Sequence, residues 1–117
     1  MKVGMISAAL ALAALWASPA SAETMDAILA NTLTTQGADG AVVRWTFNAD
    51  GTYRMTLPTG QSYGGAYVAD AQHFCITPAG GAQSCVAAAP EGKWIGDTWQ
   101  ALDAAGNRVS VAIVAGR

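Results

Sequence analysis

The two cysteines of the chain, Cys75 and Cys85, constrain its fold more than any other feature. They flank a Pro/Gly turn in the segment FCITPAGGAQSCV. If Pro78 pairs with Ala82 across a short loop, Cys75 lies opposite Cys85, and the Cβ atoms of such cross-strand pairs are about 4.5–5.5 Å apart. A disulfide forms at that separation after slight adjustment. The sequence therefore predicts a β-hairpin stapled by one disulfide, with Gly81 as the left-handed residue of its loop.

The N-terminus has the pattern of a secretory signal peptide. Lys2 gives a positive start, residues 6–16 are almost wholly apolar, and residues 20–22 form a small-x-small cleavage site. The apolar run is shorter than the roughly 20 residues that a transmembrane helix needs. We expect residues 1–22 to be a signal peptide cleaved after Ala22. Export to the periplasm or beyond, an oxidising setting, fits the even cysteine count.

The expected mature chain, residues 23–117, has the length of a single small domain. It holds five Lys and Arg against eight Asp and Glu, a net charge of −3. No basic run occurs, which disfavours nucleic acid and anionic membrane surfaces as partners. No apolar stretch predicts a membrane span in this part of the chain.

The clearest hairpin lies around the turn Asn48-Ala49-Asp50-Gly51. Apolar and polar residues alternate on both sides of it, which is typical of half-buried strands. Pairing across the turn places Trp45 opposite Met55 and Phe47 opposite Tyr53, so that one face is apolar and aromatic. A slip of one residue would invert that face.

The same alternation continues along the chain. We expect Leu57 to lie opposite Tyr63, Tyr53 opposite Tyr67, and Tyr67 to face Phe74 in the stapled hairpin. Two adjacent glycines in the middle of this stretch indicate a bulge, a bend, or a bulky side chain packed over the backbone.

The remaining predicted elements also indicate a mainly β fold. We expect a short helix over residues 24–31 with Thr24 as its cap, a first strand over residues 32–35, and a last hairpin of residues 94–102 with residues 108–114. About eight short strands joined by tight turns predict an antiparallel meander. Because closure removes exposed edges, we expect a small up-and-down barrel.

No motif indicates catalysis. His73, the sole histidine, could begin a metal site with Cys75 only if that cysteine were a free thiolate, which the disulfide forbids. A triad of His73 with Asp70 and Ser62 or Ser84 has no supporting nucleophile motif. The aspartates in the turns cap local backbone. We expect no enzyme activity, metal or cofactor.

The domain is rich in aromatic side chains. One interpretation is a core filled by large rings. The other is a pocket at the barrel mouth that takes a small apolar or aromatic ligand, with Tyr63, Tyr67 and Trp99 as its first candidate lining residues.

The order N-T-…-F-x-x-D-G-T-Y-…-G-x-Y-…-C-…-C-…-G-D-x-W runs from Asn31 to Trp99. In this order the chain resembles a group of small exported bacterial β-proteins of uncharacterised function. The resemblance implies a lipocalin-like β-architecture and no particular activity. We therefore expect an exported, non-enzymatic binding or interaction module, whose partner is a small apolar ligand or an envelope protein.

The segment SYGGAY, residues 62–67, resembles the inhibitory loop of periplasmic lysozyme inhibitors, which are also small disulfide-bearing barrels. The resemblance implies an alternative function. In that reading the protein inhibits an envelope-active hydrolase such as lysozyme through an exposed loop at residues 62–66.

Overall fold

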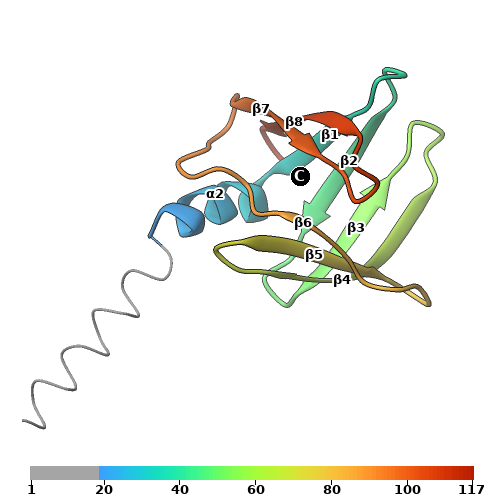
Figure 1. Cartoon of the computed structure of the whole chain (residues 1–117), viewed down its shortest axis with the longest axis horizontal. Helices are drawn as coiled ribbons and strands as arrows, with labels where there is room; N and C mark the ends of the chain where they lie inside the picture. The colour runs from blue at the N-terminus through green and yellow to red at the C-terminus, as the bar shows by residue number, and fades with distance from the viewer. Residues whose placement is uncertain (1–18) are drawn as a thin grey trace, which may run out of the picture.

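The structure is a computed structural model that describes residues 19–117 (Figure 1). Most of the predicted signal peptide, residues 1–18, lies outside the described residues. The elements are α2 (Pro19–Ala30), β1 (Thr32–Gln36), β2 (Val42–Phe47), β3 (Thr52–Thr56), β4 (Ser62–Ala69), β5 (His73–Pro78), β6 (Ser84–Ala87), β7 (Thr98–Leu102) and β8 (Arg108–Val114). The fold is therefore mainly antiparallel β with one short helix, as the sequence predicts.

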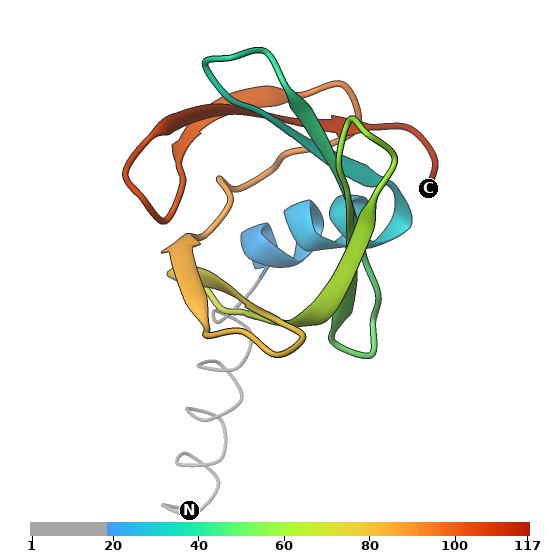
Figure 2. The same ribbon diagram turned by 90° about the vertical axis from the view of Figure 1, so that its right-hand side faces the viewer.

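All eight strands belong to one antiparallel sheet with the order β6-β5-β4-β3-β2-β1-β8-β7. The sheet curls into a nearly closed barrel, and α2 lies at one end of it (Figure 1 and Figure 2). Its two edge strands, β6 and β7, are not hydrogen-bonded to each other. The predicted barrel is thus confirmed, with one open seam.

Two predicted registers are confirmed. Trp45 lies opposite Met55 and Phe47 opposite Tyr53 in the β2–β3 hairpin. Cys75 lies opposite Cys85 and is bonded to it, with a Cα–Cα distance of 4.0 Å.

One detail of the stapled turn differs from the prediction. The left-handed residue is Gly80, with φ of 75°, and not Gly81. The Gly81 N–H donates to the Pro78 carbonyl at 2.9 Å, so the tight turn closes one residue earlier than expected.

The predicted register of β3 with β4 is wrong by two residues. Met55, and not Leu57, lies opposite Tyr63, while Tyr53 lies opposite Gly65. The cause is the turn: the Leu57 N–H donates to the Gln61 carbonyl at 2.8 Å and closes a shorter loop than the prediction assumed.

The pairing of β4 with β5 is displaced in the same way, because Tyr67 lies opposite Ile76 and Ala69 lies opposite Phe74. Tyr67 therefore reaches Phe74 along the diagonal, with ring centroids 5.7 Å apart. A shift of two residues keeps every side chain on its predicted face.

The helix begins earlier than predicted, at Pro19, so Thr24 is not its cap. The buried Thr24 hydroxyl donates to the Pro90 carbonyl at 2.7 Å and accepts from the Lys93 N–H at 3.0 Å. This tethers the segment between β6 and β7 to the helix. Ala27 and Ile28 are fully buried, so α2 fills one end of the barrel. In the part of the chain described, no helix has the length and apolarity to span a membrane.

The last hairpin is shorter than predicted, because β7 begins at Thr98 and not at Trp94. Residues Trp94 to Asp97 form a turn in which the Asp97 carboxylate accepts from the Trp94 N–H at 2.8 Å and the Asp97 N–H donates to the Trp94 carbonyl at 3.0 Å. Trp94 is consequently 53% exposed.

Phe47 is the centre of the core and is 1% exposed. Its ring lies 5.1 Å from the rings of Tyr67 and Phe74, in edge-to-face contact with both, and 6.0 Å from that of Tyr53. Aromatic pairs in such geometries contribute roughly 0.5–1.5 kcal/mol each beyond burial of area. The aromatic side chains of β2 to β5 therefore fill one side of the barrel next to the helix.

Candidate functional site

The candidate site is a cavity of about 490 Å³ inside the barrel. Ligand sites typically measure about 300–1,000 Å³ and are mostly apolar with a few polar groups. The lining comes from every strand except β3 and β4, whose side chains fill the other side. It comprises Leu33, Thr35, Gly37, Asp39, Ala41, Val43, Trp45, Phe47, Phe74, Ile76, Ser84, Val86, Ala87, Ala89, Trp99, Ala101, Leu102, Asp103, Ala104, Val109 and Val111.

The cavity has an aromatic wall made by Trp45, Phe47, Phe74 and Trp99. The Trp45 indole N–H donates to the Thr35 hydroxyl at 3.0 Å, which fixes the ring on the inner face of the sheet. Because the indole N–H already has a hydrogen-bond partner, the apolar face of the ring remains available for packing or for a ligand. The wall is therefore suited to a flat or aromatic group.

Small aliphatic side chains line much of the rest of the cavity. Ala87 and Ala89 come from β6 and the segment after it, Ala101 from β7, and Val109 and Val111 from β8. Their small size leaves part of the barrel interior unfilled, although protein cores are normally close-packed. The alanine content of the chain thus accounts for the cavity.

The mouth of the cavity is polar and carries two carboxylates. Asp39 lies in the β1–β2 turn and Asp103 in the β7–β8 turn. The Asp39 Oδ1 accepts from the Ala41 N–H at 3.0 Å, and the Asp103 Oδ1 accepts from the N–H groups of Ala105 and Asn107 at 3.0 and 2.8 Å. The carboxylates therefore stabilise the turns and give the mouth a negative charge.

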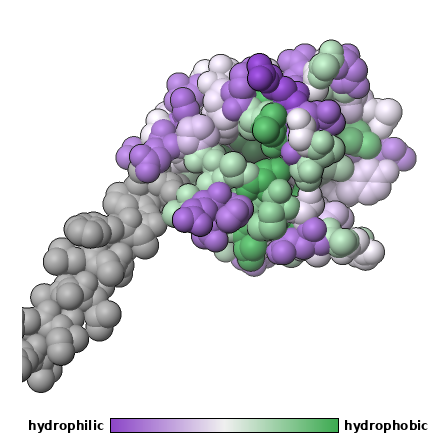
Figure 3. All heavy atoms as spheres, in the orientation of Figure 1, coloured by the Kyte–Doolittle hydropathy of each residue, from purple (hydrophilic) through white to green (hydrophobic). Residues whose placement is uncertain are grey.

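The seam between the sheet edges offers a second approach to the cavity. Ser84 and Val86 of β6 and Trp99 and Ala101 of β7 all line the cavity from the two unpaired edges. Figure 3 shows hydrophobic side chains gathered around a hollow on this face of the molecule.

The three predicted lining residues lie in different places. Trp99 lines the cavity. Tyr67 packs in the aromatic core and donates its hydroxyl to the Asn48 carbonyl at 2.7 Å. Burial raises the pKa of the Tyr67 phenol, and the negative charge of Asp50 adds to the effect. Tyr63 is 50% exposed at the start of β4.

Trp45 lies on the apolar face of its predicted hairpin and is not among the three first candidate lining residues. The period-two pattern identifies it as inward-facing. Whether an inward residue meets another side chain or an empty space depends on how far β6 and β7 lie from β1 and β2. That distance is set by tertiary packing, and no pattern in the neighbouring sequence predicts it.

The residues weighed for catalysis are not brought together. His73 is exposed on the outer face of β5, whereas Ser84 faces the cavity. The Asp70 carboxylate accepts from the N–H groups of Gln72 and His73 at 2.8 and 2.7 Å, and these bonds lower its pKa. Within residues 19–117, no group of three His, Cys, Asp or Glu side chains is placed to hold a metal ion.

Comparisons with protein-family models, curated proteins and solved structures give no match for this chain. The resemblance to small exported bacterial β-proteins and the lipocalin-like description accordingly stay predictions. Function is inferred from the geometry of the cavity.

Proposed function

We propose that the protein is a non-enzymatic binding module that holds a small apolar or aromatic ligand in the barrel cavity. The observation that carries the proposal is the cavity itself, which is about 490 Å³ in volume and is lined by Trp45 and Trp99 among other residues. A cavity of this volume with a mostly apolar lining is typical of small-molecule binding sites.

The charge of the mouth narrows the class of ligand. Asp39 and Asp103 lie at the cavity entrance, and no Lys, Arg or His is among the lining residues. A ligand with an anionic head group would meet unfavourable charge at this entrance. The proposed ligand is therefore neutral or cationic, with an apolar body that reaches the aromatic wall.

The lining also supports a role in binding and not in catalysis. Its only ionisable side chains are the two turn aspartates, and both accept hydrogen bonds from backbone N–H groups of their own turns. A general base or nucleophile needs a free group within hydrogen-bond reach of the substrate. We assign no reaction to this cavity.

Export to the periplasm or the medium remains part of the proposal and is supported by the signal-peptide pattern of residues 1–22. The alternative function, hydrolase inhibition, requires an exposed loop at residues 62–66. This segment forms the first part of β4, where residues 62–66 pair with β3 and residues 65–66 pair with β5 as well. No projecting loop is formed there, so ligand binding is the better supported function.

A fluorescent apolar probe tests the proposal. We expect neutral N-phenyl-1-naphthylamine to bind saturably and to quench tryptophan emission by energy transfer. Ala101→Phe places a ring inside the cavity and is expected to weaken probe binding by about ten-fold or more, since a filled cavity has no room for the probe. Ala66→Phe is the matched control, because Ala66 is exposed on the outer face of β4.

Two results would count against the proposal: the absence of saturable binding by the unmodified protein, or equal loss of binding in the two variants. The anionic probe 8-anilinonaphthalene-1-sulfonate tests the ligand class. It is expected to compete for the cavity about ten-fold less well than the neutral probe, because its charge meets the two carboxylates.

A further inference from the structure

Charge is segregated in this fold. Every Asp and Glu of the described residues lies in α2, a turn or a connection, and none lies in a strand. The strands carry three cationic residues, Arg44, Arg54 and Arg108. A chain with a net negative charge over residues 23–117 therefore presents a sheet surface free of acidic side chains.

Two of these arginines occupy central strands. Arg44 lies on β2 and Arg54 on β3, while the edge strands β6 and β7 contain no charged residue. Charged side chains on sheets commonly protect edges against pairing with other chains. That role does not account for arginines in the middle of the sheet.

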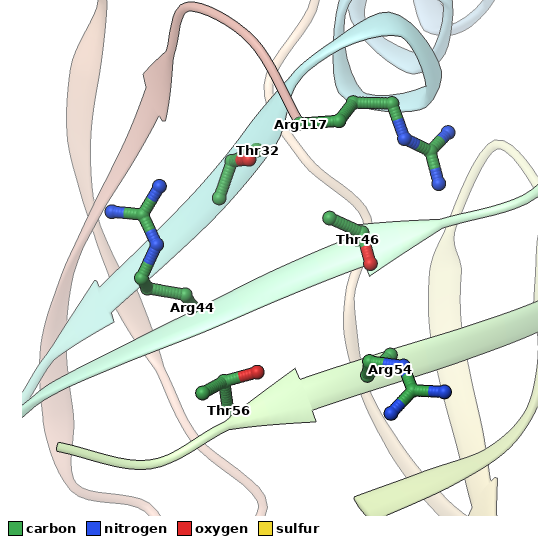
Figure 4. A pocket seen from close by; sticks show the side chains of 6 residues that line it. All are labelled: Thr32, Arg44, Thr46, Arg54, Thr56 and Arg117. Carbon is green, nitrogen blue, oxygen red and sulfur yellow. The ribbon is translucent and has the colours of Figure 1, made fainter. Parts of the chain in front are cut away.

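The register brings the two arginines together on the outer face. Arg44 lies opposite Thr56, and Thr46 lies opposite Arg54, so that cations and hydroxyls alternate on neighbouring strands. The side chain of Arg117, which follows the last strand, lines the same pocket. The resulting outer arginine pocket has a volume of about 390 Å³ and is lined by Thr32, Arg44, Thr46, Arg54, Thr56 and Arg117 (Figure 4).

The Arg117 guanidinium is held in place by neutral groups. It donates to the carbonyls of Leu29 and Phe47 at 2.7 and 3.1 Å and to the Asn48 side-chain oxygen at 2.6 Å. None of these acceptors is charged, so they fix the position of the guanidinium without cancelling its charge. An oxyanion that reaches this pocket meets a cation that is already ordered, which lowers the entropy cost of binding.

The pocket presents its cations from two sides. Figure 4 shows Arg54 and Arg117 extending on one side of Thr46, with Arg44 on the other side of the pocket. No acidic side chain is among the lining residues. Guanidinium groups match the geometry of phosphoryl oxygens. The Thr46 hydroxyl can add a further donor, whereas the Thr32 hydroxyl already donates to the Gly116 carbonyl at 2.8 Å. Separated guanidinium groups favour a ligand with more than one negative charge.

We propose that the outer arginine pocket binds a ligand bearing phosphoryl groups with at least two negative charges. The site lies on the face of the sheet opposite the barrel cavity, because Arg44 alternates with the inward-facing Val43 and Trp45 along β2. It does not depend on the function proposed for the cavity. A phosphorylated lipid head group and a soluble polyphosphate share the required chemistry.

The test is a titration of the purified protein with sodium tripolyphosphate at low ionic strength, followed by backbone amide shifts. We expect saturable shifts at residues 44–46 and 54–56. Arg44→Gln with Arg54→Gln should weaken binding by about ten-fold or more, since hydrogen bonds to charged groups are the strong ones. Thr46→Val, which keeps the charge and shape, should weaken it by about two- to five-fold.

Single arginine changes provide matched controls. Arg44→Gln and Arg108→Gln remove the same charge from exposed strand positions, but Arg108 lies on β8 and does not line the pocket. Arg108→Gln is expected to change binding by less than about two-fold, because screened long-range charge contributes little. Equal weakening by Arg44→Gln and Arg108→Gln, or no saturable binding by the unmodified protein, would overturn the proposal.

A competition experiment identifies the source of the phosphoryl group. Vesicles of phosphatidic acid, a lipid whose phosphomonoester head group carries about two negative charges, would indicate a lipid head group if they displace tripolyphosphate while phosphatidylcholine vesicles do not. Tripolyphosphate binding that is insensitive to both kinds of vesicle would indicate a soluble ligand. Arg44 and Arg54 are exposed, so the melting temperatures of the arginine variants should match that of the unmodified protein.

Discussion

The ring of Tyr53 lies directly over the backbone of Gly65. A Cβ atom at position 65 would lie 2.8 Å from the Tyr53 Cε2 atom, closer than carbon atoms approach in proteins. It would also meet the Thr77 carbonyl oxygen and, at 2.9 Å, the Pro78 Cα atom. Of the three explanations that the sequence allowed for its paired glycines, the structure shows a bulky side chain packed over the backbone. This contact lets the aromatic core close against β4 and β5.

The two glycines are predicted to differ in their tolerance of alanine. Gly65→Ala should lower the free energy of unfolding by about 2–3 kcal/mol, because backbone atoms on β5 must move to admit the methyl group. Gly64→Ala should cost less than about 1 kcal/mol, since its Cβ would lie 3.3 Å from a single atom, the Tyr53 carbonyl oxygen. Urea unfolding of both variants measures the difference. Equal losses would show that the Tyr53–Gly65 contact is not the constraint.

The disulfide is predicted to stabilise the fold by about 2–3 kcal/mol, since Cys75 and Cys85 are separated by 10 residues and close a short loop. Chemical unfolding of the Cys75→Ser/Cys85→Ser variant measures this loss. Thiol titration of the unfolded, unreduced protein should find no free thiol. Two titratable thiols would contradict the stapled hairpin.

Asn31 is predicted to be a structural link between the helix and the segment that follows the last strand. Its buried side chain donates to the Ala27 carbonyl at 2.9 Å and accepts from the Gly116 N–H at 3.0 Å. Asn31→Ala should lower the free energy of unfolding by about 2 kcal/mol, because it leaves two polar groups unpaired. Hydrogen exchange of the Gly116 amide should accelerate at the same time. The exposed Asn107 provides the control, and Asn107→Ala should cost less than about 0.5 kcal/mol.

The stability of the protein is predicted to fall at alkaline pH. Burial raises the pKa of Tyr67 above its ordinary value of 10.0. Below about pH 10 the phenol is protonated in both the folded and the unfolded chain; above it the unfolded chain loses the proton first, so stability declines as the pH rises toward the folded-state pKa.

Tyr67→Phe isolates this effect. At neutral pH it should cost about 1 kcal/mol, because the hydrogen bond to the Asn48 carbonyl is lost. Between about pH 9 and about pH 11 it should lose stability less steeply than the unmodified protein. The half-exposed Tyr63 provides the control. If Tyr63→Phe flattens the pH dependence of stability as much as Tyr67→Phe does, burial is not the cause of the raised pKa of Tyr67.

Much of the fold could be predicted because its signals are local. The turn around Asp50 and the apolar face of its hairpin fix Phe47 opposite Tyr53. The wrong register of β4 has a physical reason: a shift of two residues leaves every side chain on the same face, so the hydrophobic pattern does not distinguish the two pairings. Only the hydrogen bonds of the Leu57–Gln61 turn decide between them.

The functional surfaces could be predicted only in part because they are assembled from distant segments. Trp99 is identifiable as an aromatic residue of a strand, but the empty space beside it depends on the spacing of β6 and β7 from the rest of the barrel. The outer arginine pocket unites Arg44 and Arg54 with Arg117, which follows the last strand. Counting charges along the chain shows no basic run and gives no indication of this arrangement.

The most direct test of cavity binding is a nuclear magnetic resonance titration with N-phenyl-1-naphthylamine that follows three indole N–H signals. Trp45 and Trp99 line the cavity, whereas Trp94 is exposed on the segment before β7 and serves as an internal reference. We predict that the Trp45 and Trp99 signals shift and saturate with one common midpoint while the Trp94 signal stays in place. A shift confined to Trp94, or no indole shift while probe fluorescence saturates, would contradict ligand binding in the barrel.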